Sequence, residues 1–286
     1  MSSPSPVVRA ARTSRWAAAT VVLAALVAGC ANNGLPESAT AQGEEVTSLW
    51  GIFLWLAVAV AALIWLLTAY VVISSMRRRR RDGDDAVPRQ KQYNTRLEVV
   101  YTAIPLVLVG VLFWMTTAVN AELDNVSDAP DLTVEVIGFQ WQWQFRYPTQ
   151  ELVPDGPLVV SGSPSGPQGY PELVLPVGAT VRFELTADDV IHSFWVPEFL
   201  EKRDLIPGVD ESPSNVIEVE VTRAGTWTGR CAEYCGLNHW QMAFTVRAVP
   251  ADEFADWVRV SQAQSQPMVA GSVPGTTATT NPVSGA

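Results

Sequence analysis

The sequence predicts a hairpin of two membrane-spanning helices followed by an all-β sandwich or barrel. Residues 49–75 contain no charged side chain, and a second apolar run extends from Val99 to about Val119. From Asp131 onward, apolar and polar residues alternate in short runs separated by Pro and Gly. Alternation with this punctuation is typical of half-buried strands. The hydrophobic content of 48% is therefore concentrated in the first 120 residues, and the remainder has the composition of a soluble domain.

The N-terminal residues 1–29 are predicted to be a lipoprotein signal peptide. A positive region contains Arg9, Arg12 and Arg15, and the apolar run 16–29 that follows is too short for an ordinary spanning helix. The run ends in Leu-Val-Ala-Gly-Cys, which resembles a bacterial lipobox. We expect cleavage before Cys30 and a lipid on its sulfur, which would leave 30–48 as an extracytoplasmic segment. The alternative is a plain signal peptide that happens to contain a cysteine.

Charge sets the orientation of the predicted helices. At 1.5 Å per residue, the run 49–75 is long enough to cross about 30 Å of hydrocarbon, as is the second helix at 98–120. The loop 76–97 between them contains the arginines Arg77 to Arg81 and should be cytoplasmic by the positive-inside rule. The domain at 121–261 is then extracytoplasmic, on the same side as Cys30.

The alternating pattern predicts individual strands in this domain. The expected strands are Leu132–Ile137, Gln140–Tyr147, Thr180–Leu185, Asn215–Val221 and Gln241–Val249. We expect them to form an antiparallel sandwich or barrel. Residues 154–171, rich in Pro, Gly and Ser, are predicted to be a surface loop. Ala251–Ser261 should form a short closing helix, and 262–286 a disordered tail.

The domain is strongly acidic. Residues 121–262 contain 22 acidic and 8 basic side chains. This balance argues against a nucleic-acid partner and fits a basic protein partner. An acidic surface that only maintains solubility is the alternative.

The chemistry is concentrated in the segment C-A-E-Y-C-G-L-N-H-W-Q-M, from Cys231 to Met242. It contains one of only two histidines and two of only three cysteines in the chain. Thiolate, imidazole and thioether ligands together suit a redox copper site. Cysteines four residues apart can lie side by side on a turn between strands, and the other histidine, His192, must come from a neighbouring loop.

Several metal chemistries remain open on residue types alone. One cysteine with two histidines and a methionine would indicate a mononuclear blue-copper site, whereas two thiolates can bridge two copper ions. A structural zinc site would not need the methionine. A disulfide is the simplest alternative in an extracytoplasmic domain.

The cysteine segment, the upstream D-D-V-I-H-S-F-W-V-P and the segment R-D-L-I-P-G, together with the two preceding helices, resemble subunit II of haem–copper cytochrome c oxidase over residues 45–260. The resemblance implies a cupredoxin-like Greek-key domain. It also implies a binuclear Cu(A) centre, held by the side chains of His192, Cys231, Cys235, His239 and Met242 and by the backbone carbonyl of Glu233. The Glu233 carboxylate would bind Mg or Mn shared with subunit I.

By the same resemblance, the chain is subunit II of an aa3-type oxidase in a bacterial plasma membrane. It would accept electrons from cytochrome c and pass them to the haem groups of subunit I, where O2 is reduced to water with proton pumping. Subunit III and membrane lipid would be further partners. The alternatives are a membrane-tethered copper chaperone, which usually has fewer ligands, and a quinol oxidase subunit II, which lacks these ligands.

Four further residues have roles implied by the resemblance. Trp141 would receive the electron, although strand tryptophans are often core residues; alternation would place it on one face with Trp143. Asp188 and Asp189 resemble donor-docking acids. The family often has an aromatic residue at Gln142 and an acid at Arg146, so a tethered cytochrome domain is an alternative donor. Glu98, seven residues before Pro105, would mark a proton path; a helix N-terminal acid is the alternative.

Overall fold

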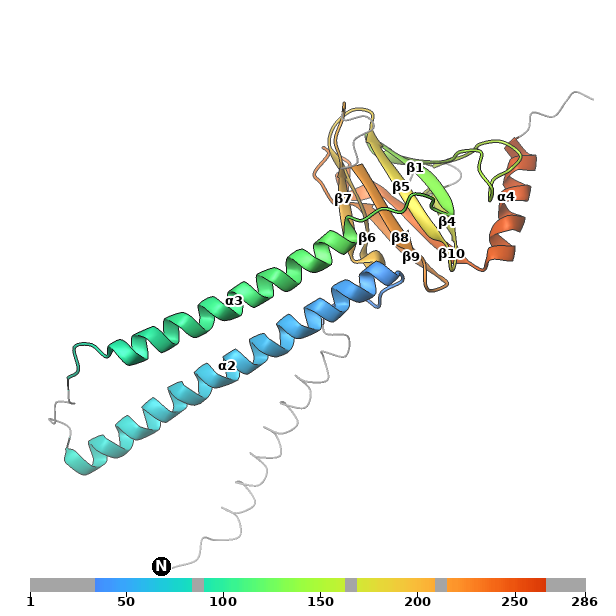
Figure 1. Cartoon of the computed structure of the whole chain (residues 1–286). Coiled ribbons are helices and arrows are strands. Elements are labelled where there is room, and N and C mark those ends of the chain that lie inside the picture. The colour runs from blue at the N-terminus through green and yellow to red at the C-terminus, as the bar shows by residue number, and fades with distance from the viewer. Residues whose placement is uncertain (1–33, 84–89, 163–168, 209–214, 266–286) are drawn as a thin grey trace, which may run out of the picture.

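The computed structural model describes residues 34–83, 90–162, 169–208 and 215–265 (Figure 1). The predicted signal peptide 1–29, Cys30 and most of the predicted tail 262–286 lie outside the described residues.

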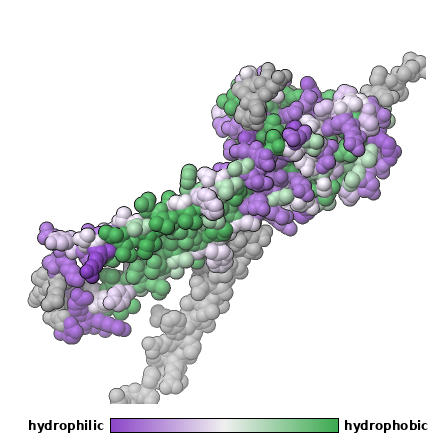
Figure 2. Space-filling model, in the orientation of Figure 1, coloured by the Kyte–Doolittle hydropathy of each residue, from purple (hydrophilic) through white to green (hydrophobic). Residues whose placement is uncertain are grey.

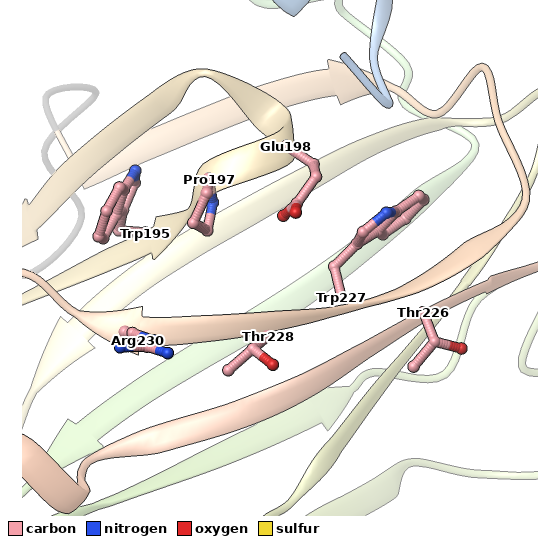
Figure 3. A pocket seen from close by; sticks show the side chains of 7 residues that line it. All are labelled: Trp195, Pro197, Glu198, Thr226, Trp227, Thr228 and Arg230. Carbon is pink, nitrogen blue, oxygen red and sulfur yellow. The ribbon is translucent and has the colours of Figure 1, made fainter. Parts of the chain in front are cut away.

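Two long helices, α2 (Ala41–Asp82) and α3 (Thr95–Leu123), lie side by side and project from one side of a β domain (Figure 1). Both are long and apolar enough to cross a membrane. Figure 2 shows their apolar surface as a continuous band with a hydrophilic far end. The large apolar side chains along both helices are mostly exposed in the isolated chain, as expected for surfaces that face lipid or other subunits.

Helix α2 extends beyond the apolar run at both ends. Its N-cap is Thr40, whose hydroxyl accepts a hydrogen bond of 3.1 Å from the Gly43 amide. Its last turn contains Arg79, Arg80 and Arg81, so part of the predicted loop 76–97 is helical. Arginine favours helix, and its charge is stabilised at a helix C-terminus.

The described residues of the β domain form two five-stranded sheets, which confirms the predicted fold of two helices followed by an all-β domain. The first has the order β3 (Leu158–Gly162), β2 (Gln142–Tyr147), β1 (Leu132–Phe139), β5 (Thr180–Ala187) and β8 (Val216–Glu220). The second has the order β4 (Glu172–Pro176), β10 (Ala243–Val249), β9 (Gly225–Cys231), β6 (His192–Val196) and β7 (Glu201–Leu205). Short 3-10 helices η1 (Pro197–Phe199) and η3 (His239–Gln241) follow β6 and precede β10, and α4 (Ala251–Ser265) closes the domain.

Two details of the predicted sheet are wrong. The sheets are not wholly antiparallel, because β1 pairs with β5 and β4 pairs with β10 in parallel. The predicted surface loop 154–171 contains the edge strand β3, whose Phe145↔Val160 register with β2 gives it a partner. Pairing between strands distant in sequence leaves no periodic signal, and the Pro and Gly residues around β3 conceal so short a strand.

Aromatic side chains fill the space between the sheets. Phe244 is 1% exposed and its ring centroid lies 5.4 Å from that of Trp143 and 5.1 Å from that of Phe194. A Cβ on Gly229, its cross-strand partner, would lie 2.0 Å from the Phe244 ring. The ring therefore occupies the space that a side chain at 229 would take, and the core reaches the backbone of β9.

Both helices are fastened to the β domain. Just before α2, the backbone of Ala39 donates to Glu198 O at 2.8 Å and accepts from Thr222 N at 2.9 Å. At the end of α3, the carboxylate of Asp124 pairs with Arg203 of β7 at 2.9 Å. Arg203 also contacts Glu201 at 3.2 Å. The domain is therefore held at two separate points of the hairpin.

Glu201 gives this junction a predicted pH dependence. Burial raises the pKa of Glu201, although Arg203 opposes the shift. The folded chain thus keeps this proton to a higher pH than the unfolded chain, so stability falls as pH rises from about 4 towards neutral. We expect Glu201→Gln to lack this fall and to gain thermal stability over the parent as pH rises. Thermal unfolding of the metal-free chain across this range measures it; a pH profile unchanged from the parent, as expected for exposed Glu184→Gln, would contradict it.

Candidate metal centre

The cysteine segment forms the connection between β9 and β10, as the spacing predicts. Cys231 is the last residue of β9, and its amide donates to Met242 O at 2.9 Å, which closes the loop. Gly236 has a φ of +116°, a conformation that side-chain-bearing residues rarely adopt. The chain can therefore turn directly after Cys235 and bring the following η3 back towards the sulfurs.

This loop gathers potential ligand atoms around two sulfurs. The Sγ atoms of Cys231 and Cys235 are 3.9 Å apart. Cys235 Sγ lies 3.5 Å from His239 Nδ1 and 3.7 Å from Met242 Sδ. Cys231 Sγ lies 3.2 Å from the carbonyl oxygen of Glu233. Each sulfur thus has a different set of neighbours.

His192 completes the cluster from another strand. It is the first residue of β6, is fully buried, and places Nδ1 3.8 Å from Cys231 Sγ. A Cβ on Gly138 of β1 would lie 3.2 Å from the His192 ring, so the glycine leaves room for the imidazole. The other ring nitrogen, Nε2, lies 2.8 Å from Asp189 Oδ1. The carboxylate can hold the proton on Nε2 and leave Nδ1 free to bind a metal.

Hydrogen bonds also separate the acidities of the two thiols. Burial raises the pKa of Cys231, but hydrogen bonds with His192 and the backbone outweigh it and leave the pKa below its usual value. Burial and the nearby Cys231 raise the pKa of Cys235 to about 12. Burial lowers the pKa of His192, whereas its contacts with Cys231 and Asp189 leave it raised overall. In the metal-free chain, Cys231 is therefore the first thiol to ionise.

The two cysteines are free thiols. Their sulfur separation of 3.9 Å is about twice the 2.05 Å of a disulfide bond. His192, Cys231 and Cys235 present ligand atoms within 4.8 Å of one another, and all three residues are buried. With the half-buried His239 and the buried Met242, the donor set comprises two thiols, two imidazoles and a thioether. This set fits copper better than a structural zinc, which needs no thioether.

Comparisons with known proteins agree with this geometry. The family described as "Cytochrome C oxidase subunit II, periplasmic domain" matches residues 132–249. A probable cytochrome c oxidase subunit 2 of Nocardia farcinica is 35% identical, over 83% of this chain and 78% of the relative. One of Streptomyces coelicolor is 38% identical, over 77% of this chain and 76% of the relative. The chain belongs to the cytochrome c oxidase subunit II family.

Among solved structures, the periplasmic domain of subunit II of the cytochrome oxidase of Bradyrhizobium japonicum is 30% identical, with a TM-score of 0.41. The matched region covers 49% of this chain and 99% of the Bradyrhizobium japonicum chain.

As a subunit II, the chain is a membrane component of a haem–copper oxidase complex, and its His–Cys–Cys cluster is consistent with the family's Cu(A) site. The expected function, transfer of electrons as part of cytochrome c oxidase, is therefore confirmed at this level.

The structure separates the two tryptophans of the motif Q-W-Q-W. Trp143 is fully buried in β2, with its ring centroid 6.3 Å from that of His192. Trp141 lies in the turn before β2, half-buried, and its Nε1 donates to Cys235 O at 3.1 Å. The alternation that would place both on one face therefore fails, because Trp141 is outside the strand. Both tryptophans contact the ligand loop 231–242, since Trp143 Nε1 donates to Met242 O at 3.5 Å, but Trp141 is the one that reaches it from the protein surface.

The acidic residues ahead of β6 have different surroundings. Asp188 is exposed, whereas Asp189 accepts hydrogen bonds from the amides of Gln140 at 2.7 Å and Val190 at 2.6 Å, in addition to its contact with His192. The side chain of Glu233 is exposed on the ligand loop. Asp189 is thus part of the support of His192 as well as a surface acid.

Glu98 lies in the first turn of α3. Its carboxylate accepts from the Asn94 amide at 2.9 Å, while the Asn94 side chain accepts from Leu97 N at 3.3 Å. This reciprocal cap is the helix N-terminal role considered as the alternative for Glu98.

Gln140 is a site residue that sequence reasoning did not single out. Its Nε2 donates to Cys235 O at 2.7 Å. In the sequence, only its position in an aromatic segment, between Gly138-Phe139 and Trp141, could have indicated a role at the site.

Proposed function

We propose that the chain is the electron-accepting subunit of an aa3-type cytochrome c oxidase, with a binuclear copper centre held by His192, Cys231, Cys235, His239 and Met242 and by the carbonyl of Glu233. One observation carries the proposal: two free, buried sulfurs 3.9 Å apart, each with its own imidazole nitrogen nearby. Two thiolates that face one another in this way can bridge a pair of metal ions.

Each of the two sulfurs has one imidazole and one further donor atom beside it. Cys231 is close to His192 and the Glu233 carbonyl, and Cys235 is close to His239 and Met242. When bound, the copper pair supplies one-electron redox chemistry shared over two ions. The chain contributes ligands from the ends of β6 and β9 and from the β9–β10 connection, and buries both sulfurs and Met242 away from water. Fixed ligands change little when the charge changes, which favours fast transfer.

The surface of the ligand loop supports docking of a donor. Tyr234, Leu237 and Trp240 are each at least 75% exposed between the ligand residues. Asp189, which contacts His192, and the exposed Asp188 that precedes it add negative charge near the metal centre. Exposed apolar groups with neighbouring acids suit a partner with a basic rim. The donor is either cytochrome c or a cytochrome domain tethered in a larger assembly; Arg146, paired with Glu135 at 3.9 Å, favours the second.

The remaining assignments rest on the family resemblance and the placement of each residue. The exposed Glu233 carboxylate is available for Mg or Mn shared with subunit I. Glu98, at the arginine-rich end of the hairpin, marks a proton path into subunit I. Residues 121–261 form the extracytoplasmic Cu(A) domain on a bacterial plasma membrane, with subunit III as a further partner. Cleavage after residue 29 and a lipid on Cys30 would add a second anchor.

Metal content tests the proposal. The full chain, purified in detergent with its thiols kept reduced and then loaded with copper, should retain two copper ions per chain after gel filtration. After oxidation to the mixed-valence state, each copper pair should take up one electron. Retention of a single ion, or of zinc in preference to copper, would contradict it.

Trp141 should conduct electrons inward without holding the metal. We expect Trp141→Ala to slow reduction of the centre by its cytochrome donor while copper content stays unchanged, because Gln140 still donates to Cys235 O. Stopped-flow reduction of the assembled oxidase, with copper determined on the same sample, measures both. Trp141→Phe, which keeps a ring, should retain more of the rate. Loss of copper in the alanine variant would make Trp141 a packing residue instead.

A further inference from the structure

Gln140 contacts both ligand-bearing loops. Its backbone N–H donates to Asp189 Oδ2 at 2.7 Å, and its side-chain Nε2 donates to Cys235 O at 2.7 Å. Residue 140 is in the turn between β1 and β2 of the first sheet. Asp189 lies in the β5–β6 connection, which joins the two sheets, and Cys235 lies in the β9–β10 connection of the second sheet. A single residue therefore links the two sheets at the end where the sulfurs lie.

Each of these contacts is made to a proposed metal ligand or to a residue that holds one. Asp189 holds His192 through Nε2 at 2.8 Å. The carbonyl of Cys235 belongs to the residue whose sulfur lies closest to His239 and Met242. Gln140 thus connects the imidazole beside one sulfur with the backbone that carries the other sulfur.

The loop is shaped to admit this side chain. A Cβ on Gly236 would lie 3.0 Å from Gln140 Nε2 and 3.4 Å from Trp141. Gly236 therefore serves two purposes, the turn at positive φ and the close approach of the amide. The other donor to the same carbonyl is Trp141 Nε1 at 3.1 Å, so Cys235 O is held by two neighbouring side chains.

We propose that Gln140 is a positioning residue that fixes His192 and Cys235 relative to one another. This inference rests on the proposed copper centre. The backbone N–H that donates to Asp189 is present in every substitution except proline, so the side-chain contact to Cys235 can be removed alone. Loss of the Gln140 side-chain donor removes the shorter bond to Cys235 O, at 2.7 Å, and leaves only the longer bond from Trp141, at 3.1 Å, so the Cys235 backbone can shift relative to His192. The separation of the metal ions and their electronic coupling then change.

The test compares Gln140→Met, which keeps length and removes the donor, with Gln142→Met as a matched control. Gln142 is half-buried in the adjacent strand. Full chains are loaded with copper, and we measure the mixed-valence absorption and EPR spectra, the reduction potential and the rate of copper loss to a chelator. We expect Gln140→Met to change the spectrum and potential and to lose copper about 10-fold faster, the lower end for outer-shell residues. Gln142→Met should match the parent.

A second variant distinguishes loss of the hydrogen bond from misfolding. Gln140→Glu keeps the shape of the side chain but places a carboxylate against the carbonyl, and it should shift the spectrum in the same direction as Gln140→Met. Spectra, potential and copper loss equal to those of the control in both variants would overturn the inference while leaving the copper centre intact. A parent chain that shows no binuclear signal would overturn both.

Discussion

Cys235→Ser is expected to abolish the binuclear centre and to reduce oxidase turnover by more than about 100-fold, beyond the usual cost of outer-shell changes. The sulfur of Cys235 lies close to three other potential ligand atoms. It is 3.9 Å from Cys231 Sγ, 3.5 Å from His239 Nδ1 and 3.7 Å from Met242 Sδ. A serine oxygen is a hard ligand and a poor substitute for a bridging thiolate. Copper content and turnover of the assembled oxidase measure the effect.

Leu237→Ser is the control for this substitution, because it introduces the same polar group on the same loop at a side chain that is 82% exposed. It should retain both copper ions. A Cys235→Ser oxidase that keeps two copper ions and normal turnover would exclude Cys235 as a bridging ligand.

Phe244→Ala should destabilise the chain by about 3–5 kcal/mol, the range for buried phenylalanine. The ring is 1% exposed and contacts Trp143, Phe145 and Phe194. Its removal opens a cavity over Gly229, one residue from Arg230 and two from Cys231. Because the Trp143 ring packs against both this ring and that of His192, we also expect weaker copper retention.

Denaturant unfolding of the metal-free chain, followed by near-ultraviolet circular dichroism, measures this loss. Tyr170→Ala, at a side chain 44% exposed, should cost less than about 1 kcal/mol. Equal unfolding free energies for the two variants would show that the aromatic layer does not carry the stability of the domain.

Much of the fold was accessible from the sequence because its signals are local. Uncharged runs predict the two helices, and alternation predicts strands such as Leu132–Ile137 and Thr180–Leu185, which lie within β1 and β5. The parallel pairing of those two strands was not predictable, because it depends on which distant segments meet. The edge strand β3 was hidden for a related reason: its pairing with β2 is visible only in three dimensions.

The candidate site divides in the same way. Rare residue types at short spacing identify Cys231, Cys235 and His239 without any structure. The residues that position these candidate ligands cannot be identified in this way. The side chain of Gln140 donates to the carbonyl oxygen of Cys235, which is 95 positions away along the chain. The residues around Gln140 in the sequence give no indication of this contact. Asp189 was expected at a docking surface, and only the folded chain shows its hydrogen bond to His192.

The central claim is that two bridging thiolates hold a copper pair that shares one electron. EPR of the copper-loaded full chain in its oxidised, mixed-valence state, one electron short of the fully reduced pair, tests it most directly. We predict a hyperfine pattern from one unpaired electron shared equally by two copper nuclei, and its loss in Cys235→Ser. A spectrum of an electron confined to a single copper nucleus in the parent chain would contradict the claim.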